Sequence, residues 1–317
     1  MRVSVVDLGT NSTRLLVAEV DGDGGVRELE RRTKVTRLGH GLEATGALGE
    51  DAMGRVFATL DEYRELIDRH DAGEHNVAVL TSAVRDAGNG DDFAAQVRER
   101  YGLDARTIPG EEEARLSFLG ATSERAPEED DTILVIDVGG GSTELIVGRG
   151  RSVTFFTSTQ VGVVRHTERH LTTDPPDAGQ LEELARAVRA TFEQAVPEDV
   201  RGSVRRAIGV AGTATSVAAI DQDLEPYDPE RVHGHRVGVA SIEAQRDRLA
   251  AMTNADRRKV KGLHPDRAPT IVAGTVILLQ ALHAFGLDEL EASEHDILRG
   301  AALDLWATAT DPGGDAA

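Results

Sequence analysis

Two short segments of the sequence combine an aspartate at the end of an apolar stretch with glycines and small hydroxyl residues. The first contains Asp7, Gly9, Thr10, Asn11 and Ser12, and the second contains Asp137, Gly139, Gly140, Gly141, Ser142 and Thr143. Because few side chains cover the backbone in such turns, successive N–H groups can form an anion-binding concavity. The hydroxyls can add donors, and Asp7 or Asp137 can hold a hydrated Mg²⁺ against a phosphate.

A third segment of small residues follows a later apolar stretch and contains Gly212 and Thr213. It predicts a further phosphate contact at the N-terminus of a helix, although turns of this kind are common. The chain has no G-x-x-x-x-G-K-[ST] P-loop, no G-x-G-x-x-G dinucleotide fingerprint and no G-x-S-x-G nucleophile elbow. The three segments are therefore not explained by the commonest phosphate-binding or nucleophile motifs.

The first two segments lie in matching surroundings. VVDLGTNSTRLLV, from Val5, and VIDVGGGSTELIV, from Val135, correspond over 13 positions, and Asp7 and Asp137 are 130 residues apart. A match of this length indicates an internal duplication, so we expect two related α/β domains that bring both turns to one cleft. The polar, acidic stretch 121–131 is typical of a linker. The predicted domains are 1–124 and 125–310, with a last helix able to pack back on the first domain and a disordered tail at 311–317.

Hydrophobic periodicity predicts the elements that position these turns. The expected strands are 3–6, 15–20, 26–37, 77–80, 133–136 and 206–210. The expected helices are 51–70, 91–100, 111–119, 178–195, 241–251, 268–285 and 296–308. The most apolar of these stretches, Ile271–Phe285, is shorter than the ~20 residues that span a bilayer and is expected to be a buried helix.

Composition limits the classes of function. The 317 residues include no cysteine, which excludes disulfides, thiolate metal sites and cysteine nucleophiles. Asp and Glu number 55 against 35 Lys and Arg, and the net charge of −20 argues against a nucleic-acid partner. Asp7, Asn11 and Arg14 interrupt the apolar start, so no signal peptide is expected. These features predict a cytoplasmic protein that does not bind membranes.

Six segments together resemble the exopolyphosphatase and guanosine pentaphosphate phosphohydrolase family, in that family's order. They are DLGTNSTRLLV (7–17), TSAVRDAGN (81–89), PGEEEARLSFLG (109–120), DVGGGSTEL (137–145), GVAGTATSVAA (209–219) and LRGAAL (298–303). The resemblance implies two ribonuclease-H-like domains of the actin-like superfamily around a central cleft, in a short form without the additional C-terminal HD-type domain. It also implies hydrolysis of terminal orthophosphate from inorganic polyphosphate, or of guanosine pentaphosphate, by a homodimer.

The resemblance assigns roles to individual residues. Glu113, which immediately precedes the Ala-Arg of its motif, corresponds to the general base that activates water. Asp137 and Glu144 are expected to hold Mg²⁺, for which Mn²⁺ could substitute, and Asp7 is a third candidate ligand. Arg85 is expected to clamp phosphate, because a guanidinium binds phosphate oxygens bidentately; the alternative is a solvated ion pair with Asp86.

Two other functions remain compatible with the same motifs. An ATP-dependent small-molecule kinase of this fold would need a catalytic aspartate for its acceptor and an adenosine pocket. A non-catalytic sensor of polyphosphate or of an alarmone would bind without turnover. The motif around Glu113 favours hydrolysis over the first, and the presence of Glu113, Asp137 and Glu144 favours it over the second.

Several further residues have weaker functional signals. His166 and His170 are spaced like a metal pair but are expected on the surface, and His295-Asp296 lacks the other ligands of an HD phosphohydrolase. His233 and His235 lie in an expected loop and stay unassigned. Two groups of basic residues could guide a long polyanion: Arg257, Arg258, Lys259, Lys261 and Arg267; and Arg31, Arg32, Lys34 and Arg37. The sequence departs from the family at Pro269 and at Arg299-Gly300, which lacks an intervening glutamate.

Overall fold

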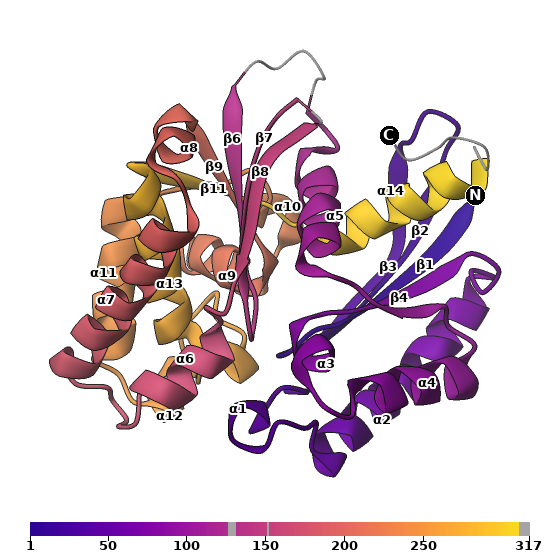
Figure 1. Cartoon of the computed structure of the whole chain (residues 1–317), viewed down its shortest axis with the longest axis horizontal. Helices are drawn as coiled ribbons and strands as arrows, with labels where there is room; N and C mark the ends of the chain where they lie inside the picture. Colours follow the sequence, from indigo (N-terminus) through magenta and orange to yellow (C-terminus); the bar gives the residue numbers. More distant parts are fainter. Residues whose placement is uncertain (126–130, 151, 311–317) are drawn as a thin grey trace. The chain divides into compact units, whose positions relative to one another are not determined.

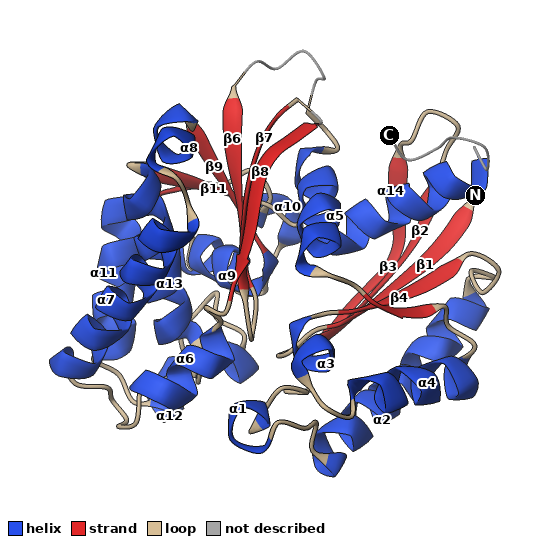
Figure 2. Ribbon diagram, viewed as in Figure 1, coloured by secondary structure: helices blue, strands red, loops and turns tan. Residues whose placement is uncertain are grey.

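The computed structural model describes residues 1–125, 131–150 and 152–310 of the chain. These residues form two compact units, one from Met1–Gly120 together with the segment that begins at Asp296, and one from Ala121–His295. Each unit contains one mixed β-sheet with helices against it (Figures 1 and 2). Among the described residues, no helix has the length and apolarity needed to cross a membrane.

The sheet of the first unit has the strand order β3-β2-β1-β4-β5. Its strands are β1 (Arg2–Leu8), β2 (Thr13–Val20), β3 (Val26–Lys34), β4 (Asn76–Leu80) and β5 (Ala105–Thr107). Its helices are α1 (Leu42–Thr45), α2 (Glu50–Arg69), α3 (Ser82–Asp86), α4 (Gly90–Tyr101), α5 (Gly110–Thr122) and α14 (Ile297–Thr310). The strand β1 pairs antiparallel with β2 and parallel with β4.

Both faces of this first sheet are buried, which explains the nearly continuous apolar run of β1. Val6 and Leu8 point into a core built with α2 and α4, whereas Val3 and Val5 point into a core built with α14. Figure 1 shows α14 and the α2–α4 pair on opposite faces of the sheet. The alternation along one strand therefore fixes which helices lie on which side.

The sheet of the second unit has the order β10-β11-β9-β6-β7-β8. Its strands are β6 (Thr132–Val138), β7 (Thr143–Arg149), β8 (Ser152–Thr159), β9 (Arg206–Val210), β10 (Arg236–Gly238) and β11 (Glu289–Ala292). Its helices are α6 (Val163–His170), α7 (Ala178–Ala195), α8 (Glu198–Ser203), α9 (Ala211–Asp221), α10 (Pro229–Val232), α11 (Val239–Ala250), α12 (Asn254–Arg257), the 3₁₀-helix η1 (Pro265–Arg267) and α13 (Ile271–Phe285). The apolar helix α13 packs against both α7 and α11 and is buried, as its sequence predicts.

The two sheets share one topology, which confirms the predicted α/β class and the duplication. In each, the first strand begins a three-stranded antiparallel meander on one side and has two successive parallel strands on the other. The second sheet adds β10, which pairs antiparallel with β11. The repeat extends to the tight turn after the first strand. The Gly9 N–H donates to the Ser12 carbonyl at 3.0 Å, and the Gly139 N–H donates to the Ser142 carbonyl at 2.9 Å.

Several boundaries differ from the predicted ones for local reasons. The strand expected at 26–37 ends at Lys34, and Arg37 adopts a φ of 52°, outside the β region. Gly212 and Thr213, expected in a turn, lie in the first turn of α9. The hydrophobic periodicity gives no prediction for several further elements, which are β5, β8, β10, β11, α1, α3, α6, α8, α10 and α12.

The boundaries of the units differ from the predicted ones at 125 and 310, while the last helix packs back on the first unit as the prediction allowed. The second unit begins at Ala121 rather than at 125, and it ends at His295, so that α14 is grouped with the first unit. This grouping follows from packing, since α14 lies against β1 and β2. The predicted tail at 311–317 lies outside the described residues.

Two glycines let α5 and α14 approach backbone to backbone. A Cβ atom on Gly300 would lie 1.8 Å from the Leu116 carbonyl oxygen, and one on Gly120 would lie 1.9 Å from the Asp296 carbonyl oxygen. Neither oxygen belongs to a flexible side chain, so an added methyl group must force the helices apart. This contact fixes α5, the helix that carries Glu113.

Replacing Gly300 with alanine is therefore expected to destabilise the protein by at least about 1–3 kcal/mol, the usual cost of overpacking. The change is measured as a shift of the denaturant midpoint. The control is Gly54→Ala on the exposed face of α2, where a new Cβ meets nothing within 4 Å. That control is expected to stabilise slightly, by about 0.5–1 kcal/mol, because alanine is the better helix former. Equal effects of the two substitutions would contradict the packing explanation.

Candidate active site

In the first unit, the candidate residues gather at the carboxyl ends of three parallel strands. The turn at residues 9–12 follows β1, α3 follows β4, and α5 begins shortly after β5. Because β1, β4 and β5 are neighbours in the sheet, the segments that follow them meet at one edge. Strand order thus brings together motifs that are far apart in the sequence.

In the turn after β1, other backbone groups bind the carbonyls, whereas the N–H groups of residues 10–12 are not used within the turn. The carbonyls of Thr10 and Asn11 accept hydrogen bonds of 2.9 Å from the N–H groups of Gly39 and Arg37. Within the described part of the chain, the N–H groups of residues 10–12 donate to no protein acceptor. The turn therefore has the donor arrangement expected of an anion site.

Glu113 lies in the first turn of α5 and is 7% exposed. Its Oε2 accepts a hydrogen bond of 3.1 Å from Nη1 of Arg85, which also donates to the carbonyl of Ile108 at 2.9 Å. The structure thus places the predicted base and the predicted phosphate clamp side by side. The spacing in the sequence gave no sign of this contact, since the two residues are joined only through the order of β4 and β5.

Asp7, a candidate Mg²⁺ ligand in the sequence, forms an ion pair in the structure. Its Oδ2 is 2.7 Å from Nη2 of Arg14, and Arg14 also pairs with Asp296. Burial raises the pKa of Asp7 against the opposing effect of Arg14. Burial acts in the same direction on Asp296, but Arg14, Arg31 and the Leu298 N–H bring its pKa below the ordinary value. Since Asp7 is paired with a cation, the geometry gives no support to its role as a metal ligand.

The turn in the second unit repeats the first, and α6 satisfies its carbonyls. The acceptor–donor pairs are Gly139 with the Val163 N–H, Gly140 with the Val164 N–H, and Gly141 with Nε of Arg165. A Cβ on Gly162, just before α6, would lie 2.3 Å from the Gly140 carbonyl oxygen, so this approach requires glycine. Within the described residues, the N–H groups of 140–142 donate to no protein acceptor.

The Thr143 hydroxyl makes a hydrogen bond within the local fold. It is fully buried and donates to the carbonyl of Val161 at 2.5 Å. The hydroxyl therefore supports the local fold, and its predicted contact with phosphate is not supported by the geometry.

Two buried carboxylates face each other in the second hairpin. Asp137 and Glu144 are directly opposed in the β6–β7 register and are 7% and 1% exposed. The Oε1 of Glu144 accepts a hydrogen bond of 2.7 Å from Ser158. In the first hairpin the corresponding partner of Asp7 is Arg14. Like charges opposed across strands are unfavourable, so the Asp137–Glu144 pair suits a cation, and oxygen ligands of this kind suit Mg²⁺.

The third phosphate candidate lies in the first turn of α9, next to an arginine. A Cβ on Gly212 would lie 1.3 Å from Nη1 of Arg267, so the guanidinium occupies the space that a side chain would need. Thr213 packs against Gly274 of α13, where a Cβ would lie 2.9 Å from the Thr213 Oγ1. A guanidinium beside a helix N-terminus brings two positive ends together, an arrangement that an anion would stabilise.

Two weaker sequence predictions are corrected. His166 is not on the surface but 4% exposed, and burial lowers its pKa to about 4, so the ring is neutral at pH 7. Arg257 is not a guide for a polyanion, because it is buried, pairs with Asp174 and donates to the carbonyls of Met252 and Ala268. Arg267, which the sequence analysis grouped with Arg257, does lie at a candidate phosphate contact, beside Gly212.

Comparisons with known proteins find relatives that match nearly the whole chain. The model of the Ppx/GppA phosphatase family matches residues 16–306. Exopolyphosphatase 2 of Mycobacterium tuberculosis is 37% identical over 316 residues, which cover 96% of this chain and 98% of the relative. The crystal structure of an exopolyphosphatase-like protein superposes with a TM-score of 0.89 at 36% identity, covering 96% of this chain and 97% of that one. An Aquifex aeolicus Ppx/GppA family member gives a TM-score of 0.82 at 30% identity, with 99% of both chains covered.

Proposed function

Since the chain belongs to the Ppx/GppA phosphatase family, we propose that it removes terminal orthophosphate from inorganic polyphosphate, with Mg²⁺ as cofactor and Glu113 as the general base. The family makes it a phosphoanhydride hydrolase. The role of Glu113 rests on one observation: this glutamate is buried and accepts a hydrogen bond from Arg85. It lies at the same edge of the sheet as the turn at residues 9–12. A buried, oriented carboxylate is what activation of a water molecule requires.

The second unit has groups of its own that suit phosphate and a divalent cation. The N–H groups of residues 140–142 and the first turn of α9, with Arg267 beside it, would hold phosphate oxygens. Asp137 and Glu144 fit a divalent cation because they are buried, opposed and offer oxygen ligands only. When bound there, Mg²⁺ would neutralise part of the phosphate charge.

The reaction balances with water as the only co-substrate. Glu113 takes a proton from water, whose oxygen forms a bond to the terminal phosphorus. The bond from that phosphorus to the bridging oxygen breaks, and the products are orthophosphate and a chain shortened by one phosphate. Such transition states are loose, so positioning and charge stabilisation dominate over covalent chemistry.

Guanosine pentaphosphate offers the same terminal phosphoanhydride and is the second substrate to be tested. The relative named above is an exopolyphosphatase, which favours polyphosphate as the first. A kinase would need an aspartate for its acceptor, whereas the buried acid in the first turn of α5 is a glutamate held by arginine. A sensor would not need a buried base.

The proposal is tested by orthophosphate release from polyphosphate of defined lengths, with and without Mg²⁺, with guanosine pentaphosphate and ATP in parallel. We expect release from polyphosphate that depends on Mg²⁺ and does not need an acceptor. Turnover of ATP only when a sugar or carboxylate is added would support the kinase. Tight binding of polyphosphate without release under any metal condition would support the sensor.

A further inference from the structure

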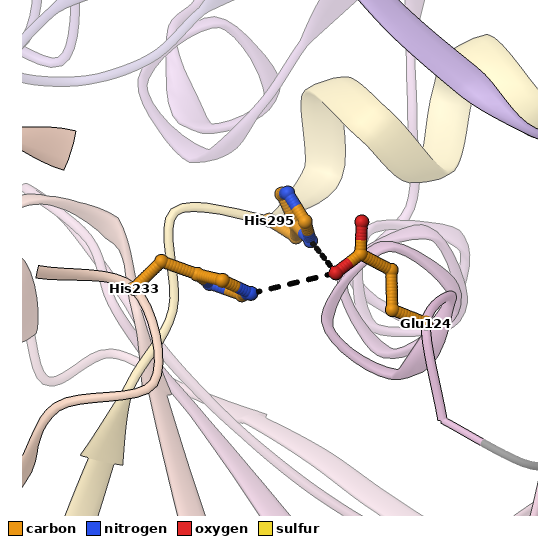
Figure 3. A group of neighbouring side chains, drawn as sticks. All are labelled: Glu124, His233 and His295. Atoms are coloured by element: carbon orange, nitrogen blue, oxygen red, sulfur yellow. Dashed lines mark ion pairs between the residues drawn. The ribbon is translucent and has the colours of Figure 1, made fainter. Parts of the chain in front are cut away.

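The second unit contains another group of side chains able to bind a ligand, and none of them is among the residues proposed above to bind phosphate or Mg²⁺. Glu124, His233 and His295 present one carboxylate oxygen and two ring nitrogens that all lie within 4.8 Å of one another. Oε2 of Glu124 is 3.7 Å from Nε2 of His233 and 3.8 Å from Nδ1 of His295. Figure 3 shows both rings turned toward this one oxygen.

The separations between these atoms fit coordination of one metal ion better than hydrogen bonds between the side chains. Hydrogen bonds between N and O join the atoms at about 2.7–3.2 Å, which is shorter than either separation. A tetrahedral metal centre with bonds of about 2.0–2.1 Å places its ligand atoms about 3.3–3.4 Å apart. A closure of about 0.4 Å between Glu124 and each histidine would therefore bring these atoms to the spacing of such a centre, and the two ring nitrogens lie within 4.8 Å of one another.

The backbone fixes both histidines at the end of β11. Gly234, at a φ of 78°, donates its N–H to the carbonyl of Ala292 at 2.8 Å, which holds the adjoining His233 beside this strand end. The Ser293 hydroxyl donates to the carbonyl of His295 at 3.0 Å and accepts from the His295 N–H at the same distance. The ring centroids of His233 and His295 are 4.2 Å apart.

Glu124 is tied to the same strand through its neighbour, since Nη2 of Arg125 is 3.0 Å from Oε1 of Glu291 on β11. The N–H of Glu294 donates to Nδ1 of His233 at 3.3 Å and keeps Nε2 directed at Glu124. A metal at Nε2 requires the ring proton on Nδ1, so this long hydrogen bond would be given up on binding. The chain segments that carry the three residues are thus held at the end of one strand.

We propose that Glu124, His233 and His295 form a binding site for a divalent transition-metal ion of the Zn²⁺ class. Two imidazoles and one carboxylate are a typical Zn²⁺ ligand set, and three protein ligands leave one position for water. Mg²⁺ prefers oxygen ligands alone, so this site differs in chemistry from Asp137 and Glu144. Solvent reaches the site, because the Glu124 side chain is 56% exposed and that of His233 is 35% exposed.

A metal at this place would join the two ends of the second unit. That unit runs from Ala121 to His295, so Glu124 lies near its beginning and His295 is its last residue. An ion held by both would cross-link the segment that follows α5 to the segment that precedes α14. We therefore expect Zn²⁺ to stabilise the folded chain in addition to binding it.

The site is tested by calorimetric titration of the full chain with Zn²⁺, in the presence of excess Mg²⁺ to occupy oxygen-only sites. We expect a saturable Zn²⁺ site that His295→Gln or Glu124→Gln weakens at least about tenfold. The matched control is His283→Gln, since Nε2 of His283 lies 3.8 Å from Oε1 of Glu243 and the described residues supply no third ligand there. Circular dichroism establishes that each variant is folded.

Two further measurements make the outcome decisive. Zn²⁺ is expected to raise the thermal midpoint of the wild type and of His283→Gln, but not of His295→Gln. Bound Co²⁺ is expected to give visible absorption bands typical of nitrogen ligands, and these bands are lost in His233→Gln. Undiminished Zn²⁺ affinity in His295→Gln would overturn the proposal, and so would a loss of binding in Asp137→Asn or His283→Gln instead.

Discussion

Replacing Glu113 with glutamine is expected to lower kcat for orthophosphate release about 10²–10⁴-fold while leaving polyphosphate binding nearly unchanged. Glutamine keeps the size of the side chain, and its carbonyl oxygen can still accept the 3.1 Å hydrogen bond from Arg85. It cannot accept a proton from water. The substitution therefore separates proton transfer from positioning, and the measurement is steady-state release together with equilibrium binding of polyphosphate.

The control for this experiment lies on the same helix. Glu111 is also in the first turn of α5, but its side chain is exposed, so Glu111→Gln is expected to retain activity within about twofold. If Glu113→Gln keeps more than about a tenth of the activity, another group must be the base. If it loses binding rather than kcat, Glu113 acts by holding Arg85 and not by proton transfer.

The parts of this site that could be predicted from the sequence are those carried by local pattern. The strand–turn–strand repeat around Asp7 and Asp137 is contiguous in each half, so both turns and the duplication could be found by alignment alone. The contact of Arg85 with Glu113 could not, because it depends on the order of β1, β4 and β5. No periodicity specifies which parallel strand lies beside which.

The difference between the two turns becomes visible once the hairpin register is set beside the sequence. The hairpin register places residue 14 opposite Asp7 and residue 144 opposite Asp137. One partner is Arg14 and the other is Glu144, so only the second hairpin opposes two acids. The two halves of the repeat have therefore diverged at this position. In the first half the aspartate is opposite the guanidinium of Arg14, and in the second it is opposite Glu144, a pair that suits a bound cation.

Other features had no usable signal. Gly120 and Gly300 look like poor helix residues until the crossing of α5 and α14 is known, since the need for glycine arises from the partner's backbone. His166 lies in α6, which is too short for a clear apolar period, so its burial could not be separated from exposure. In each case the missing information is tertiary packing.

Replacing Asp137 with asparagine is expected to lower activity at least about 10²-fold and to abolish stabilisation by Mg²⁺. Removing one carboxylate weakens the site for the cation, whose charge stabilisation amounts to several kcal/mol in phosphoryl transfer. The same change relieves the opposition of Asp137 and Glu144 across β6 and β7. Without Mg²⁺, the variant is therefore expected to unfold at the same temperature as the wild type or at a higher one.

The two readouts together distinguish a metal ligand from a residue needed only for folding. Thermal midpoints are measured in EDTA and in excess Mg²⁺, beside orthophosphate release under the same metal conditions. Asp131→Asn is the control, because Asp131 lies just before β6, at the other end of that strand, and pairs with Arg206 at 3.0 Å. That variant should keep both activity and the Mg²⁺ shift. An Asp137→Asn protein that Mg²⁺ stabilises as much as the wild type would place the cation elsewhere, whatever its activity.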